Sequence, residues 1–172
     1  MTAHDTLSDS FLDEALTALE MPVPELLRSY LEESPQRFEG LMRELAARLQ
    51  DRAVPGEVAA RDDGAFSVDG CTVVLRRNPD NDYIEIFCDV GQPKPHDEHA
   101  TYRAALELNL CRTYPGLTLG VHPQSGRIVA TLAAHSLLIR DVDTCLQILD
   151  LLTVQVQRIR ESRVLALADE GA

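Results

Sequence analysis

Apolar residues recur at helical spacing along the first third of the chain. Such stripes predict a short amphipathic helix over 8–19, a second over 24–31 and a third over 34–50. A serine followed by a proline is typical of a helix cap and first turn, so the last helix is expected to begin at Ser34 and Pro35. The first third is therefore predicted to be helical, with breaks between short helices.

The apolar period then changes from helical spacing to short β-branched segments. Segments 65–68, 71–77 and 83–88 are rich in Val, Ile, Phe and Tyr and are separated by turn residues. The first turn is Asp69-Gly70, a strong signal for a two-residue hairpin loop. The pattern predicts a three-stranded antiparallel meander.

The second half of the chain repeats the alternation of helix and strand. A helix over 97–112, apolar on two sides, should be followed by strands at 117–121 and 127–138. Asp141 is placed to cap a long last helix, which is expected to fray from Arg158 on. Helices, three strands, a helix, two strands and a helix predict an α+β fold, with an antiparallel sheet flanked by helices.

Composition narrows the possible functions. The 172 residues suffice for one domain, and their net charge of −12 disfavours nucleic acid and anionic membrane as partners. The acidity suits a basic or neutral protein partner, and equally serves solubility alone. No signal peptide or membrane-spanning run is readable, so a cytoplasmic protein is expected.

The cysteines are interpreted as reduced, buried thiols. All four lie in apolar sequence context, without a C-x-x-C pair: Cys71, Cys88, Cys111 and Cys145. A catalytic thiol–imidazole pair of Cys111 with His122 or His135 is disfavoured, because Cys111 lies near a helix C-terminus, where the dipole raises a thiol pKa.

The remaining chemistry is sparse. His96 and His99, separated by two acids, could share a helical face and bind a metal, but no third ligand is evident, so a solvated helix start is the preferred interpretation. Phosphate-binding glycine loops and nucleophile motifs are absent from the sequence. No metal, cofactor or catalytic residues are therefore predicted, and the chain is not expected to be an enzyme.

One stretch of the second half has a more specific pattern. A Leu-rich helix end at 105–110 contains Asn109, and the hairpin segment that follows, 117–129, contains Gly120 and Gly126. This stretch resembles the class I type III secretion chaperones, the Tir-chaperone-like group, in which an "L-x-x-N" helix end precedes an "lGl-d-x-x-tG-x-v-v-l" hairpin.

The resemblance extends over about 34–163, with 38–50 similar to the family's first helix and 66–75 to its opening hairpin. His122 stands where an Asp is common. Residues 1–33 precede the family's usual first helix. The expected organisation is an N-terminal helical extension over 1–33, a chaperone-like domain over 34–165 and a flexible tail over 166–172.

The resemblance implies a homodimer in the bacterial cytoplasm that binds the N-terminal segment of secreted effector or translocator proteins. That segment would be kept extended and secretion-competent without ATP hydrolysis by the chaperone, and the secretion ATPase is a further expected partner. The physics of the residues fits, because an extended chain can add to a sheet edge and fill apolar grooves.

Candidate surfaces follow from this interpretation. The effector-binding residues expected on the first family-like helix and on strand faces are Phe38, Leu41, Leu45, Leu49, Phe66, Val68, Leu119 and Val129. The dimer residues expected on the two sides of helix 97–112 are Tyr102, Leu106 and Leu110 on one side and Ala104, Leu108 and Cys111 on the other. Which side faces outward is not fixed by sequence, and each of these residues could instead belong to an ordinary core. As a test, Leu45→Glu should abolish partner capture and leave the dimer intact, whereas loss of folding would assign Leu45 to the core.

Two other functions fit parts of the pattern. One is a regulatory protein-binding module of the secretion apparatus on the same fold, which would show a compact partner surface. The other is a small enzyme with a dispersed site, which needs converging polar groups that the sequence does not assemble.

Overall fold

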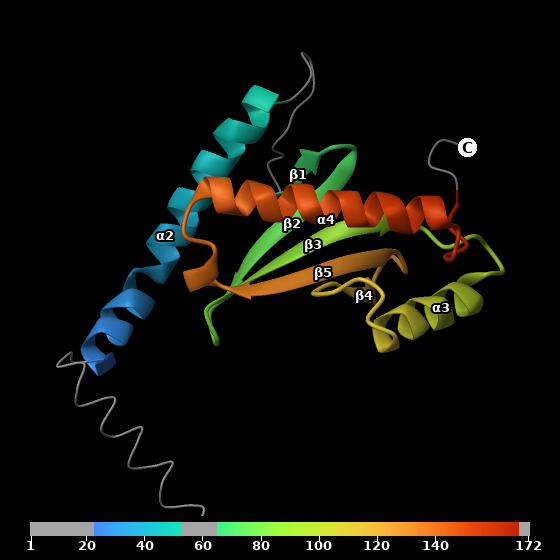
Figure 1. The fold of residues 1–172 in the computed structure, drawn as a ribbon, viewed down its shortest axis with the longest axis horizontal. Helices are drawn as coiled ribbons and strands as arrows, with labels where there is room; N and C mark the ends of the chain where they lie inside the picture. Colours follow the sequence, from blue (N-terminus) through green and yellow to red (C-terminus); the bar gives the residue numbers. More distant parts are fainter. Residues whose placement is uncertain (1–22, 53–64, 169–172) are drawn as a thin grey trace, which may run out of the picture. The chain divides into compact units, whose positions relative to one another are not determined.

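The structure is a computed structural model that describes residues 23–52 and 65–168 (Figure 1). The chain divides into two compact units, 1–35 and 36–172. The helix predicted over 8–19 and the connection expected over 53–64 lie outside the described residues.

The first described element is one long helix, α2 (Val23–Arg52), with Pro35 inside it. The prediction of two helices broken at Ser34–Pro35 is therefore wrong. A proline within a helix removes one backbone hydrogen bond and crowds the preceding turn. The flanking Leu, Glu and Arg residues are strong helix formers, and the helix continues through the proline.

Five antiparallel strands form one sheet in the order β1-β2-β3-β5-β4. The first hairpin closes with Val68 opposite Cys71, and the turn residues Asp69 and Gly70 have φ angles of 49° and 73°. Both angles lie in the left-handed region that a type I′ hairpin needs, as the sequence predicts. The strands are β1 (Ala65–Val68), β2 (Cys71–Asn78), β3 (Tyr83–Gly91), β4 (Thr118–Val121) and β5 (Ile128–His135).

Helices follow the strands in the expected order. They are α3 (Glu98–Leu110), the short 3₁₀ helix η1 (Ser136–Leu138) and α4 (Val142–Ser162). The predicted strand over 127–138 therefore ends at His135, and its last part turns into η1. Asp141 caps α4 as predicted, because its carboxylate accepts a hydrogen bond of 2.7 Å from the backbone N–H of Thr144.

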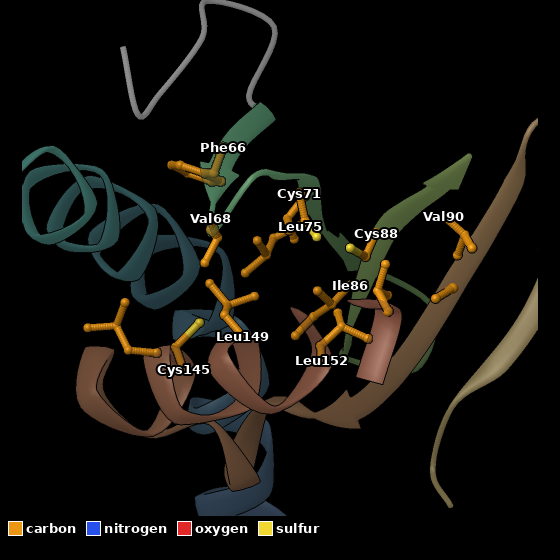
Figure 2. Packing of buried hydrophobic residues seen from close by; sticks show 14 of the residues in the cluster. Phe66, Val68, Cys71, Leu75, Ile86, Cys88, Val90, Cys145, Leu149 and Leu152 are labelled. Carbon is orange, nitrogen blue, oxygen red and sulfur yellow. The ribbon is translucent and has the colours of Figure 1, made fainter. Parts of the chain in front are cut away.

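The core lies between one face of the sheet and α4, which lies across the sheet (Figure 1). Figure 2 shows side chains of β1, β2 and β3 pointing toward Leu149 and Leu152 of α4. Alternate residues of β2 and β3 are buried on this face, which is the pattern of strands covered on one side. Leu45 and Leu49 of α2 belong to the same buried cluster.

Three cysteines are buried in this core, as predicted, and the fourth is not. Burial raises the pKa of Cys145 to about 12, and the pKa of Cys88 is raised by its hydrogen bond with Cys71 and by burial. The prediction that Cys111 is buried is wrong. Cys111 is the C-cap of α3, one residue beyond the helix, and its side chain is exposed.

The segment after α4 returns to the sheet. Leu167 forms an isolated β-bridge with Pro93, and backbone hydrogen bonds of 2.8 Å join Lys94 to Ala166 and Ala168 to Gln92. The expected flexible tail begins at 166, but residues 166–168 are held by these bonds. Among the described residues, no helix is both long enough and apolar enough to cross a membrane.

Candidate functional site

The sheet face opposite α4 forms a shallow apolar groove of about 630 Å³. Alternation along the strands brings Val74 of β2, Phe87 of β3 and Val129 of β5 onto this face, and Val121 of β4 borders it. Val74 and Phe87 are directly opposite in the β2–β3 register. We call this surface the open sheet face.

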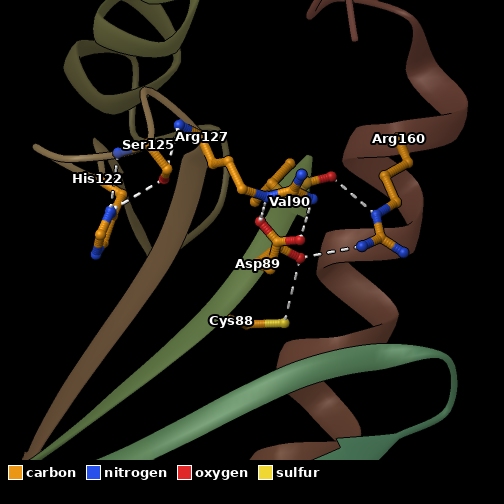
Figure 3. Close-up of polar contacts among 7 residues, drawn as sticks. All are labelled: Cys88, Asp89, Val90, His122, Ser125, Arg127 and Arg160. Carbon is orange, nitrogen blue, oxygen red and sulfur yellow. Dashed lines mark hydrogen bonds and ion pairs between the residues drawn. The ribbon is translucent and has the colours of Figure 1, made fainter. Parts of the chain in front are cut away.

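Ion pairs border the apolar residues of the open sheet face. Arg127 binds both carboxylate oxygens of Asp89, with Nε 2.9 Å from Oδ1 (Figure 3). Arg76 donates to Glu85 at 2.6 Å, and its guanidinium carbon lies 5.6 Å from the centre of the Phe87 ring. Charged groups surrounding an apolar floor are typical of a surface that takes an apolar chain segment in a fixed position.

Glu85 has a lowered pKa because Arg76, and secondly Asn78, donate hydrogen bonds to its carboxylate. A carboxyl group whose pKa is lower in the folded than in the unfolded protein stabilises the fold at pH values above its unfolded-state pKa. This contribution is lost as the pH falls through the folded-state pKa. We expect Glu85→Gln to lower stability at pH 7 and to lower it less at pH 3. Urea unfolding at both values measures this, and an equal loss at both would contradict the electrostatic explanation.

Helix α3 is fixed to the β4–β5 hairpin by side-chain contacts with backbone groups. The side-chain amide of Asn109 donates to the carbonyl of Leu119 and accepts from its N–H, both at 2.8 Å. The Asn109 side chain thus makes the two backbone hydrogen bonds that a neighbouring strand would make with Leu119 of the edge strand β4. The hydroxyl of Tyr102 donates to the carbonyl of Gly126 at 3.1 Å, and Gly126 has the left-handed φ of 70° that this turn requires.

This geometry predicts that Asn109→Asp destabilises the protein by about 1–3 kcal/mol, the usual cost of an unsatisfied partly buried group. The carboxylate keeps the acceptor for the Leu119 N–H but sets a negative oxygen against the Leu119 carbonyl. Chemical unfolding measures the loss. Asn81→Asp is the matched control, because Asn81 is exposed and its side-chain oxygen accepts from the N–H of Tyr83, as a carboxylate also can. Equal losses in the two variants would contradict the special role of Asn109.

The outer face of α3 carries the largest exposed apolar side chains of this helix. Leu106 is 67% exposed and Leu110 is 84% exposed. The two leucines are one helical turn apart, so they form one patch on this face. The neighbouring pair Arg103–Glu107, with N···O 2.9 Å, is also exposed.

The six expected dimer residues do not separate into the two predicted sides. Leu106, Leu110 and Cys111 are exposed, whereas Tyr102, Ala104 and Leu108 are half-buried and pack against the core. The sequence pattern groups Tyr102 with the two leucines, but its hydroxyl binds the hairpin. The two buried residues of α3, Thr101 and Ala105, belong to neither predicted set.

The eight expected effector-binding residues also differ in exposure. Phe38, Leu41 and Val129 are half-buried, and only Val129 borders the groove. The other five belong to the buried core: Leu45, Leu49, Phe66, Val68 and Leu119. In the described arrangement these five side chains offer almost no surface to a partner.

Sequence reasoning missed most of the groove. The sequence pattern places Val74 and Phe87 in strands but in no site, although both alternate with the buried residues Val73 and Cys88. Leu151 and Val154, exposed on α4, were also unassigned.

The structure assembles no reactive group among the described residues. No cluster of three or more His, Cys, Asp or Glu side chains there could hold a metal ion. His96 precedes α3 and has a φ of 75°, so it does not share a helical face with His99. His122 contacts Ser125, with Nδ1 3.0 Å from Oγ, and His135 stacks edge-on against Tyr83, so neither histidine is paired with Cys111.

Comparison with known proteins gives matches at the level of structure. No protein-family model and no curated protein sequence matches the chain. A chain of the solved ExsC-ExsE complex matches with a TM-score of 0.55 and 14% identity, over 76% of this chain and 97% of that one. A chain of the HopA1-SchA chaperone-effector complex matches with a TM-score of 0.48 and 17% identity, over 72% and 93%.

At such identities the first match establishes the fold. It spans nearly the whole of the neighbour's chain and about three quarters of this one. This chain therefore has the α+β fold that its resemblance to the class I type III secretion chaperones implies.

Proposed function

We propose that this protein is a type III secretion chaperone that binds an extended segment near the N-terminus of a secreted effector or translocator protein. The observation that supports this proposal best is the open sheet face, an apolar groove that no described element covers. Two further properties agree with this proposal: the chain has the fold that its resemblance to the secretion chaperones implies, and its net charge is acidic.

The open sheet face fits an extended apolar segment better than a folded partner. Its floor extends over three neighbouring strands, and its shallow form can take alternate side chains of a β-like peptide. β1 is an edge strand of the sheet, where an added strand can pair. On the other edge strand, β4, Asn109 already binds the outer backbone groups of Leu119. An unfolded client loses conformational entropy when it binds, so it needs a large binding surface. Phe38 and Leu41 of α2 pack against the core and do not line the open sheet face, so they form a separate candidate contact for the client.

A second copy of the chain would cover the outer face of α3. Leu106 and Leu110 are among the most exposed large apolar side chains of the described residues, and an isologous pair of α3 helices would bury both from each copy. In this proposal Cys111 lies at the edge of the interface, while Tyr102, Ala104 and Leu108 hold α3 in place from its inner side.

The chaperone acts by binding alone and has no catalytic step of its own. We place it in the bacterial cytoplasm, where the secretion ATPase would receive the loaded complex. A compact partner surface, which a regulatory module would need, has less support than the groove.

The groove is tested by replacing Val74 and Val129 together with aspartate. Each lost apolar contact at the centre of an interface costs about 1–2 kcal/mol, so the two changes together should weaken client binding about thirtyfold to several hundredfold. Val154→Asp is the control, because Val154 is 47% exposed, against 37% for Val74, but lies on α4. The measurement is titration with the co-purified client. If the control weakens binding as much as the groove variant, the open sheet face is not the client surface.

A further inference from the structure

His122 closes the β4–β5 hairpin and also lines the open sheet face. Its backbone N–H donates to the carbonyl of Arg127 at 2.8 Å, and its carbonyl accepts from the N–H of Gly126 at 2.9 Å. These bonds fix the residue at the start of the turn, while its side chain is exposed at the edge of the groove. His122 is thus both a turn residue and part of the candidate client surface.

The hydrogen bonds of the turn determine which ring nitrogen of His122 carries the proton. Nδ1 is 3.3 Å from the backbone nitrogen of Ser125, which can only donate, so Nδ1 is the acceptor in this contact. The hydroxyl of Ser125 lies 3.0 Å from the same ring nitrogen. In a neutral imidazole one nitrogen accepts and the other donates, so the proton of neutral His122 is on Nε2.

The Nε2–H group of His122 is a donor that the fold does not use. Figure 3 shows this nitrogen at the end of the ring that is turned away from Ser125, and it meets no acceptor within the described residues. The other side-chain nitrogen donors that line the groove are those of Arg76 and Arg127, and each arginine is paired with a carboxylate. His122 therefore supplies the groove with an N–H that is not committed to a carboxylate.

The turn itself does not require an imidazole. An aspartate at 122 would hold a carboxylate oxygen near the place of Nδ1 and accept the same N–H three residues later, as Asp141 does from Thr144. The imidazole adds a donor that lies farther from the backbone and takes no part in the turn. The turn thus explains the acceptor nitrogen of His122 but not the donor.

We propose that the Nε2–H of His122 donates a hydrogen bond to a backbone carbonyl of the bound client segment, and so fixes where that segment crosses the open sheet face. A segment that covers Val74 and Val129 buries backbone carbonyls that no strand of the sheet pairs, and an unpaired buried carbonyl weakens binding. A donor at the groove edge satisfies one such carbonyl and selects one position of the segment. This inference rests on the proposed function, because it names a contact of the client at the same surface.

The first test is nitrogen NMR of the full chain with isotope-labelled histidines. At about pH 8 the spectrum distinguishes the two neutral tautomers, and the His122→Gln variant identifies the signals of His122. We expect the Nε2-protonated form in the free chain, and a shift of its Nε2–H signal when the co-purified client is added. A ring protonated at Nδ1, or an Nε2–H signal that the bound client leaves unchanged, would overturn the proposal.

Two amide substitutions separate client binding from the turn. His122→Asn keeps an acceptor at the place of Nδ1 but has no group at the place of Nε2, whereas His122→Gln reaches the place of Nε2 with an N–H and lacks the turn acceptor. The Asn variant should unfold in urea like the wild type and bind the co-purified client about threefold to tenfold more weakly. The Gln variant should be less stable but bind within about twofold of the wild type. His99→Asn, at an exposed position outside the groove, is the matched control and should change neither property.

The outcomes separate this inference from the proposed function. If His122→Asn binds the client like the wild type, or if affinity falls in parallel with stability in both variants, His122 only closes the turn and the inference is wrong. The Val74 and Val129 double variant decides separately whether the open sheet face binds the client. Titration of His122→Asn at high salt identifies the acceptor: a loss that persists supports a carbonyl, and a loss that disappears would indicate a client carboxylate and overturn the assignment.

Discussion

Leu106→Glu combined with Leu110→Glu is expected to convert a dimer of twice the chain mass into a monomer. Burial of a leucine contributes about 1.5–3 kcal/mol, and an isologous interface would lose two leucines from each copy. The new carboxylates would also face one another across the two-fold axis. Because both side chains are exposed in the single chain, the fold itself should keep its stability.

Sedimentation equilibrium at micromolar concentration measures the mass, and thermal unfolding checks the fold. Leu151→Glu is the matched control, because Leu151 is 58% exposed but lies on α4. A wild-type chain that is already monomeric, or a Leu151→Glu variant that dissociates equally, would contradict an interface through α3.

Leu45→Glu is expected to unfold the protein. The sequence alone predicts the opposite, a variant that stays folded and loses only partner capture. Leu45 is 0% exposed and belongs to the core beneath the sheet. Removing such a side chain costs about 2–5 kcal/mol even as Leu45→Ala, which is a large part of a usual total stability of about 5–15 kcal/mol. A buried, unpaired carboxylate adds a further penalty.

Circular dichroism with urea unfolding measures the effect on Leu45→Ala and Leu45→Glu. Ala47→Glu, at an exposed position of the same helix, should leave stability nearly unchanged. A folded Leu45→Glu variant with wild-type stability would show that the side chain is accessible after all.

Local signals in the sequence predict most of the secondary structure because their causes are local. Asp69-Gly70 can adopt two left-handed conformations in succession, and the carboxylate of Asp141 reaches a free N–H of the next turn. The break predicted at Pro35 failed because a proline only weakens a helix, and its neighbours decide whether the helix continues.

The surfaces are harder to predict, because exposure depends on packing between distant segments. Alternation separates Val74 from Val73, but sequence does not say which face of the sheet α4 covers. On α3, Tyr102 shares a helical stripe with Leu106 and Leu110. Its hydroxyl nevertheless donates to the carbonyl of Gly126, which is 24 residues later in the chain. The pocket between the end of β3 and the end of α4 likewise brings Lys94 close to residues some 70 positions later, and no local pattern marks it.

The central claim is that an extended client segment occupies the open sheet face. Its most direct test is hydrogen–deuterium exchange of the purified client complex against the free protein. We expect slower exchange in peptides of β2, β3 and β5 and in one continuous segment near the client's N-terminus. Client residues on either side of that segment should stay unprotected. Unchanged exchange in those strands, or protection spread over a folded domain of the client, would contradict it.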